Sequence, residues 1–232
     1  MIIYVLAALS YAVSIFIDVS VYHLKYNIQD NKNVRYLLSL INIFQYSARA
    51  FVLLFMPIMA FITESLKDKD LVWNITILSH FFVVILLLPL FSSKFSSFLS
   101  IKVIEILNFI FGKSKKINLS QIQKKNNIIK DTPTLSLTNV LFFVITFIAG
   151  FLFSMSITFL YYLSFSFPQK ALMLSSLTQI INMFGSLILV LFIDPKIMSC
   201  IDEEEGYHEI SMLTMSRVIV HLILILILLI IK

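Results

Sequence analysis

Residues Tyr36–Glu64 read YLLSLINIFQYSARAFVLLFMPIMAFITE, a long apolar run with one arginine near its middle. The hydrocarbon core of a bilayer is about 30 Å thick and needs roughly 20 helical residues to cross it. This run therefore predicts a membrane-spanning helix with Arg49 close to mid-bilayer. Because an arginine at that depth costs at least about 2.5 kcal/mol on insertion scales, its guanidinium is expected to face protein or water.

The composition extends the membrane prediction to the whole chain. Of the 232 residues, 59% are hydrophobic and 13% are charged, which gives more apolar surface than a soluble core of this size can hide. Few glycines and prolines, and no repeat or low-complexity tract, favour a single transmembrane domain over residues 1–232. The first twenty residues lack a basic segment and a small-residue cleavage site, so they are expected to remain as the first helix.

Six stretches are long and apolar enough to cross a bilayer. The sequence therefore predicts an all-α polytopic integral membrane protein with about six transmembrane helices. The predicted spans are Ile2–Tyr22, Tyr36–Phe61, Leu71–Phe91, Leu135–Phe165, Ala171–Ile193 and Met212–Ile231.

The segment 92–134, between the third and fourth spans, divides into an amphipathic helix and a basic loop. The helix has one polar face, Lys94, Ser97, Lys102, Glu105 and Asn108, and one apolar face, Leu99, Val103, Ile106, Leu107 and Ile110. This pattern is typical of a helix in the membrane interface. The basic part, 113–131, suits a loop at an anionic membrane surface. The alternative is a seventh span over Phe95–Phe111, which would place Lys102 and Glu105 inside the membrane.

The basic residues predict the orientation in the membrane. The first, third and fifth loops carry three, eight and one of the lysines and arginines, whereas the opposite side carries four. Since cytoplasmic loops are enriched in these residues, the odd loops are expected in the cytoplasm and both termini outside. The net charge of +5 thus follows mostly from topology, and no nucleic-acid partner is predicted.

Polar side chains recur at helical spacing in five of the six predicted spans. The sets are Tyr11, Ser14, Asp18 and Tyr22; Asn42, Gln45 and Arg49; Ser154, Thr158 and Tyr161; Ser175, Thr178, Asn182 and Ser186; and Thr214, Arg217 and His221. Residues at i, i+3 and i+7 share one face of a helix. Polar faces are costly against lipid, so we expect these five to converge on a shared polar cavity.

Structural explanations compete with a shared cavity and stay open at the level of sequence. Serine and threonine in membrane helices commonly bond a preceding carbonyl, and His23, His80 and His221 can serve helix packing alone. Asp18 and Arg49 could form a structural ion pair. Arg217 could extend outward to the membrane interface.

The familiar catalytic and metal-binding motifs are incomplete. His208-Glu209 begins like the HExxH zinc motif, but Met212 stands where the second histidine is required. Gly112-Lys113-Ser114 imitates the end of a phosphate-binding P-loop, but Leu107 stands in place of its first glycine. The single cysteine, Cys200, excludes an intramolecular disulfide and a cysteine-cluster metal site. We therefore predict neither a catalytic centre nor a metal ion or cofactor.

Several blocks of the sequence match the pattern of a known family. They are Leu38-Ser-Leu-Ile-Asn42, Ala48-Arg49 and Pro57 in the second span, Leu177–Ile193 followed by Asp194-Pro195 and the acidic 202–206, and Ser216-Arg217. In their order and spacing they resemble the Amj-type lipid II flippases, the family that is the alternate to the MurJ flippase. These blocks cover under half of the chain. The chain departs from the family pattern at Ser14, Ala48 and Val52. The resemblance therefore carries over Arg49, Asp194 and Arg217 as site residues.

The resemblance implies a flippase that moves lipid II, the undecaprenyl-pyrophosphate-linked peptidoglycan precursor, across the bacterial cytoplasmic membrane for cell wall biogenesis and cell shape. Its expected partners are lipid II and membrane lipids. We expect Arg49, together with Arg217, to contact the diphosphate and Asp18 to hold Arg49 in the empty site. The full set of candidate substrate-binding residues is Arg49, Arg217, Asp18, Asn42, Gln45, Asn182, His221 and Asp194.

Two other functions remain open from the sequence. One is a membrane enzyme acting on a polyprenyl phosphate or an acyl lipid, for which Asp194, His208 and Glu209 are the candidates near the interface. The other is a non-transporting membrane scaffold, which would tolerate loss of the polar helix faces. The driving force and the oligomeric state are also left open.

Overall fold

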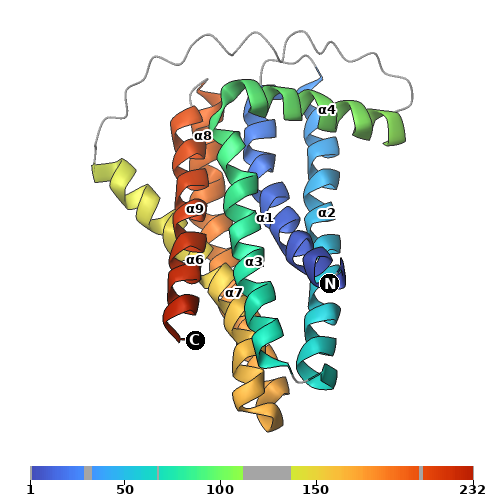
Figure 1. Cartoon of the computed structure of the whole chain (residues 1–232). Coiled ribbons are helices and arrows are strands. Elements are labelled where there is room, and N and C mark those ends of the chain that lie inside the picture. Colours follow the sequence, from blue (N-terminus) through green and yellow to red (C-terminus); the bar gives the residue numbers. More distant parts are fainter. Residues whose placement is uncertain (1, 29–32, 67, 112–136, 204–205, 232) are drawn as a thin grey trace.

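The fold comes from a computed structural model that describes residues 2–28, 33–66, 68–111, 137–203 and 206–231 (Figure 1). These residues are almost entirely helical and contain no strand. The elements are α1 (Ile2–Ile28), α2 (Val34–Phe61), η1 (Ile62–Leu66), α3 (Lys69–Leu87), η2 (Leu88–Phe91), α4 (Ser93–Phe111), α6 (Leu137–Ser166), η4 (Pro168–Lys170), α7 (Ala171–Ile188), η5 (Leu189–Ile193), α8 (Asp194–Asp202) and α9 (Tyr207–Ile231).

Six helical segments within the described residues are long and apolar enough to span a membrane, which confirms the all-α polytopic prediction. They are Ile3–Ile28, Val34–Leu66, Lys69–Phe91, Leu137–Ser166, Pro168–Asp202 and Tyr207–Ile231. The first extends beyond the predicted end at Tyr22. Its last turns continue as helix because Leu24 and Ile28 are fully buried in a cluster that also contains Leu37 and Ile104.

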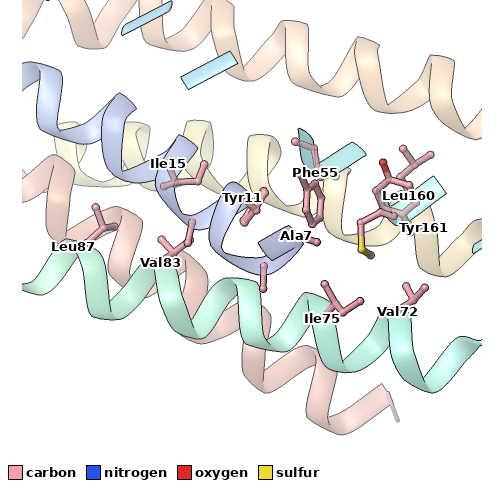
Figure 2. Packing of buried hydrophobic residues seen from close by; sticks show 14 of the residues in the cluster. Ala7, Tyr11, Ile15, Phe55, Val72, Ile75, Val83, Leu87, Leu160 and Tyr161 are labelled. Atoms are coloured by element: carbon pink, nitrogen blue, oxygen red, sulfur yellow. The ribbon is translucent and has the colours of Figure 1, made fainter. Parts of the chain in front are cut away.

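The centre of the bundle is α1, which packs against α2, α3, α4 and α9, while α6 packs against α7 and α9. Figure 2 shows the apolar core around Tyr11, where α1 meets Phe55 of α2 and Ile75 and Val83 of α3. Helix α1 brings small side chains such as Ala7 and Ala8 into this core, both fully buried. Small residues let membrane helices approach closely, which explains the dense packing around this helix.

Helix α4 lies across one end of the bundle instead of alongside the spans (Figure 1). The alternative of a seventh span over this segment is therefore wrong. The predicted division of its faces is also partly wrong, because Ser97 is buried whereas Ile106 and Ile110 are exposed. Asn27 of α1 explains the difference: its Nδ2 donates to Ser96 Oγ and Ser100 Oγ, each at 2.9 Å, which turns the serine-rich face inward.

The spans alternate in direction through the bundle. The end of α1, the start of α2, α4 and the end of α8 lie at one end, and the α2–α3 and α6–α7 junctions lie at the other (Figure 1). The first, third and fifth connections therefore share one side, as the sequence requires. The basic loop at 113–131 lies outside the described residues, so its cytoplasmic location stays a prediction.

Cysteine labelling tests this orientation. In a Cys200→Ser background, Asp70→Cys should react with a membrane-impermeant maleimide on intact cells, because its end of the bundle is predicted to face outward. Lys94→Cys should react only after the membrane is permeabilised. Both replaced residues are exposed, and the background protein without cysteine is the control for non-specific labelling. The reverse pattern would show that the orientation is inverted.

Candidate functional site

A cavity of about 770 Å³ lies between α1, α2, α6, α7 and α9. Its apolar lining includes Ile15, Val19, Phe153, Ile157 and Leu189. Seven of the eight candidate residues also line it: Asp18, Asn42, Gln45, Arg49, Asn182, Asp194 and Arg217. The expected convergence is thus confirmed for the whole polar set of α2 and for part of the sets of α1, α7 and α9, while the role of these residues in substrate binding stays a prediction.

The α2 wall of the cavity is a row of polar side chains at helical spacing. Asn42, Gln45 and Arg49 all line the cavity, and Asn42 and Arg49 are exposed, so the cavity is open along this helix. The Arg49 guanidinium carbon lies 5.2 Å from the ring centroid of Tyr46, at the distance of a cation–π contact. The Arg49 charge therefore does not have to face lipid, because the Tyr46 ring and the polar side chains of the cavity both offer it contacts.

The predicted ion pair between Asp18 and Arg49 is not formed. Among the described residues, the ion pair with an N–O distance within 4.0 Å is Lys102–Glu105 on the surface of α4. Asp18 instead experiences two positive charges, Arg217 more strongly and Arg49 more weakly. The expectation that Asp18 holds Arg49 directly is therefore wrong: the Arg49 guanidinium lies over the Tyr46 ring, and the charge of Arg217 acts on Asp18 more strongly than that of Arg49.

Arg217 points inward, so the alternative of an outward extension to the interface is wrong. Its side chain is only 9% exposed and crosses over Gly150 of α6. A Cβ at Gly150 would collide with Arg217 Nη1 and would lie 3.1 Å from both Cδ and Cζ. The absence of a side chain at this one position therefore lets Arg217 pass between α6 and α9 into the cavity.

Asp194 reaches the cavity because the helix before it changes register. In a regular α-helix a residue eight positions after Ser186 lies well off the face of Ser186. The π-helical η5 inserts about one extra residue into the turn, so Asp194 takes the place of an i+7 neighbour. Tyr22 of α1 then donates a hydrogen bond to the Asp194 carboxylate across the cavity wall. Helical spacing alone could not have found this residue.

The walls formed by α7 and α6 differ in polarity. Asn182 and Ser186 line the cavity from α7, and Asn182 accepts a hydrogen bond from Ser156 of α6. The cavity face of α6 is apolar, with Phe153 and Ile157. The predicted polar face of α6 is therefore wrong as a cavity wall. Its residues serve other contacts: Thr158 lies 2.9 Å from His80 Nε2, and Tyr161 donates to the Met56 carbonyl at 3.2 Å.

His221 is the candidate that does not line the cavity. It is fully buried one helical turn from Arg217, and its Nδ1 lies 2.8 Å from Nδ1 of His80. The sequence predicts only a structural role in helix packing for His80. The contact joins two helices that are far apart in the chain, so no local pattern could reveal it.

The charged groups of the cavity are suited to binding an anion in a low-dielectric site. Two guanidinium groups, Arg49 and Arg217, face two carboxylates, Asp18 and Asp194, with the amides of Asn42 and Gln45 beside them. Arginine offers a planar fork of donors that matches phosphate oxygens. Among the described residues, no group of three or more histidine, cysteine or carboxylate side chains could hold a metal ion.

A second cavity of about 620 Å³ continues along α2 from the first. Met56 lines both cavities, and the second is also lined by Pro57, Glu64, Tyr161 and Ser175. From Asn42 to Glu64 a helix rises about 33 Å at 1.5 Å per residue, which is the thickness of a hydrocarbon core. The two cavities together therefore follow α2 across the membrane.

Comparisons with protein-family models, curated proteins and solved structures find no match to this chain. The likeness to the flippase family therefore rests on the sequence blocks alone.

Replacing Gly150 by alanine tests the path of Arg217. The added methyl should displace the guanidinium and lower the free energy of unfolding by about 1 kcal/mol, at the lower end of overpacking costs because the arginine can yield. Unfolding titrations in detergent micelles measure this value. In an Arg217→Ala background the same substitution should cost less than half as much. An equal cost in both backgrounds would contradict the described contact.

Proposed function

We propose that this protein is a flippase for lipid II and carries the diphosphate-linked headgroup through the cavity between α1, α2, α6, α7 and α9. The observation that supports it best is the gathering of Arg49, Arg217 and five further polar candidates around one cavity of about 770 Å³. These residues come from four of the six spans. Their meeting at one place within an apolar bundle is unexplained if each serves only local packing.

Binding of a diphosphate would account for the presence of two arginines in the cavity. Crossing the hydrocarbon strips water from the phosphate oxygens, and charge-assisted hydrogen bonds from guanidinium forks offset that loss. In the empty site Asp18 lies under the influence of both arginines, which keeps the local charge balanced. An arriving anion can then compete with Asp18 for these arginines, so binding is exchangeable instead of permanent.

The lipid tail needs an open side, and the surface next to the cavity provides one. Tyr46 and Leu53 of α2 are 65% and 70% exposed, and Val190 of η5 is 56% exposed. All three also line the cavity. A prenyl chain can therefore stay in the membrane against these side chains while the polar headgroup occupies the interior.

The second cavity supplies the remainder of the route. Met56 lines both cavities, and its carbonyl accepts the hydrogen bond from Tyr161. Pro57 follows directly within α2, where it removes a backbone donor and weakens the helix against bending. Bending of α2 at Pro57 would join the two cavities. In this proposal the headgroup triggers that bending in order to pass from one cavity to the other.

Arg49→Ala tests the proposal in cells. In a strain that lacks other lipid II flippases, the variant should fail to support growth, and transport in reconstituted vesicles should fall by at least about tenfold, the loss of one charge-assisted contact. Arg35→Ala is the matched control, because Arg35 is an exposed arginine of the same helix outside both cavities. It should retain growth and transport.

Folding and membrane insertion of both variants have to be verified by expression and by gel filtration. Normal growth with a correctly inserted Arg49→Ala protein would refute the proposed function.

A further inference from the structure

A second group of polar side chains, which do not line the cavity of Arg49 and Arg217, surrounds the imidazoles of His80 and His221. We call it the histidine cluster; it consists of His80, His221, Tyr11, Ser154 and Thr158, contributed by α1, α3, α6 and α9. Both histidines are essentially inaccessible, at 1% and 0% exposure. Tyr11 stacks edge-on against the two imidazoles, with ring centroids 5.6 Å from His80 and 6.2 Å from His221.

The hydrogen bonds of this cluster fix where its protons are. Thr158 Oγ1 donates to the Ser154 carbonyl at 2.6 Å, so it can only accept from His80 Nε2, 2.9 Å away. His80 therefore carries its proton on Nε2 and presents a bare Nδ1. Nδ1 of His221, at 2.8 Å, must then be the donor in the bond between the two rings. It follows that Nε2 of His221 has a free lone pair.

That lone pair is buried and unused. Among the described residues, His221 Nε2 has no hydrogen-bond partner, and neither do the Tyr11 hydroxyl and Ser154 Oγ. Tyr11 and Ser154 face one another without reaching full hydrogen-bond geometry. An unsatisfied buried polar atom costs about 1–3 kcal/mol, so three around one site call for an explanation. Hydroxyls can donate or accept, so they can serve His221 Nε2 both with and without a proton.

The charges that face this site link it to the cavity. The α1 and α3 neighbours, Tyr11 and His80, are neutral in this arrangement, and α6 contributes only hydroxyl groups. On α9, Arg217 lies one turn from His221, and its positive charge acts on both His221 and Tyr11. A second positive charge on His221 is opposed by Arg217 for as long as that guanidinium has no anion beside it.

We propose that Nε2 of His221 is a proton-binding site coupled to anion binding at Arg217, so that a lipid diphosphate and a proton are taken up together. The inference rests on the proposed function, since the anion is the lipid diphosphate. The step is a protonation: a proton from the bulk solution adds to the Nε2 lone pair, the neutral imidazole becomes an imidazolium cation, and the resulting N–H finds an acceptor in the hydroxyls of Tyr11 or Ser154. By reciprocity, the proton raises the affinity for the anion as much as the anion raises the affinity for the proton.

The first experiment reads the proton positions without any ligand. Purified protein labelled with ¹⁵N-histidine is examined by NMR, and the four histidines are assigned with single His→Gln variants. We expect His80 to carry its proton on Nε2 and His221 to carry it on Nδ1. A proton on Nε2 of neutral His221 would remove the vacant acceptor and overturn the inference, whatever the protein transports.

The second experiment measures proton uptake directly. Farnesyl diphosphate, a short prenyl diphosphate, is titrated into the full-length protein by calorimetry in buffers of different ionisation enthalpy. We expect an uptake of up to about one proton per ligand bound, as coupled sites require. The uptake should disappear in His221→Gln, and in His221→Phe if glutamine prevents folding. It should persist in the control His208→Gln, which removes an imidazole outside the histidine cluster and outside both cavities.

The two proposals fail in different ways. Binding without proton uptake, or uptake that survives the loss of His221, overturns the coupling and leaves the flippase proposal standing. No binding of the diphosphate at any pH, with His221 in the expected tautomer, overturns the flippase proposal and the coupling built on it.

Discussion

The cost of placing guanidinium groups inside a hydrocarbon layer governs this structure. Arg49 and Arg217 cannot be hydrated by lipid, so the protein has to surround them with its own polar atoms or with a ligand. The helices leave a polar cavity around the two arginines, and Arg49 forms no ion pair with Asp18. Asp18, influenced by both arginines, is the counter-charge, and Gly150 supplies the space that Arg217 needs. The amide side chains that line the cavity from α2, and the amide and hydroxyl side chains that line it from α7, follow from the same requirement.

Much of this arrangement could be predicted from the sequence because two simple rules determine it, the length of apolar runs and the spacing of polar residues along a helix. Hydropathy located all six spans, since no alternative element can bury 20 apolar residues in a bilayer. Helical spacing then grouped Asn42 with Arg49 and Asn182 with Ser186, and these pairs do share the cavity. Each rule depends on residues close in the chain, so it holds wherever the helix is regular.

The features that the sequence did not predict depend on contacts between residues far apart in the chain or on irregular helical segments. Asp194 joins the cavity only because η5 changes the helical register, which spacing rules assume to be constant. The polar face of α6 turns toward His80, a residue of another span whose importance no local pattern signals. The inward serines of α4 likewise depend on Asn27, about seventy positions earlier in the chain. Such partners become visible only once the helices are assembled.

Helix α2 lines both cavities, the one that contains Arg49 and the one that contains Glu64. In the proposed function, Arg49 is the positive charge that the lipid headgroup meets on this helix. Site-specific photo-crosslinking tests this central claim most directly. With a benzophenone amino acid in place of Tyr46, the protein should crosslink to labelled lipid II in membranes, and the crosslink should weaken in Arg49→Ala. The same probe in place of Phe81, an exposed residue of α3 outside the cavities, should capture bulk lipid only. Equal capture of lipid II at both positions, or none at Tyr46, would contradict the account.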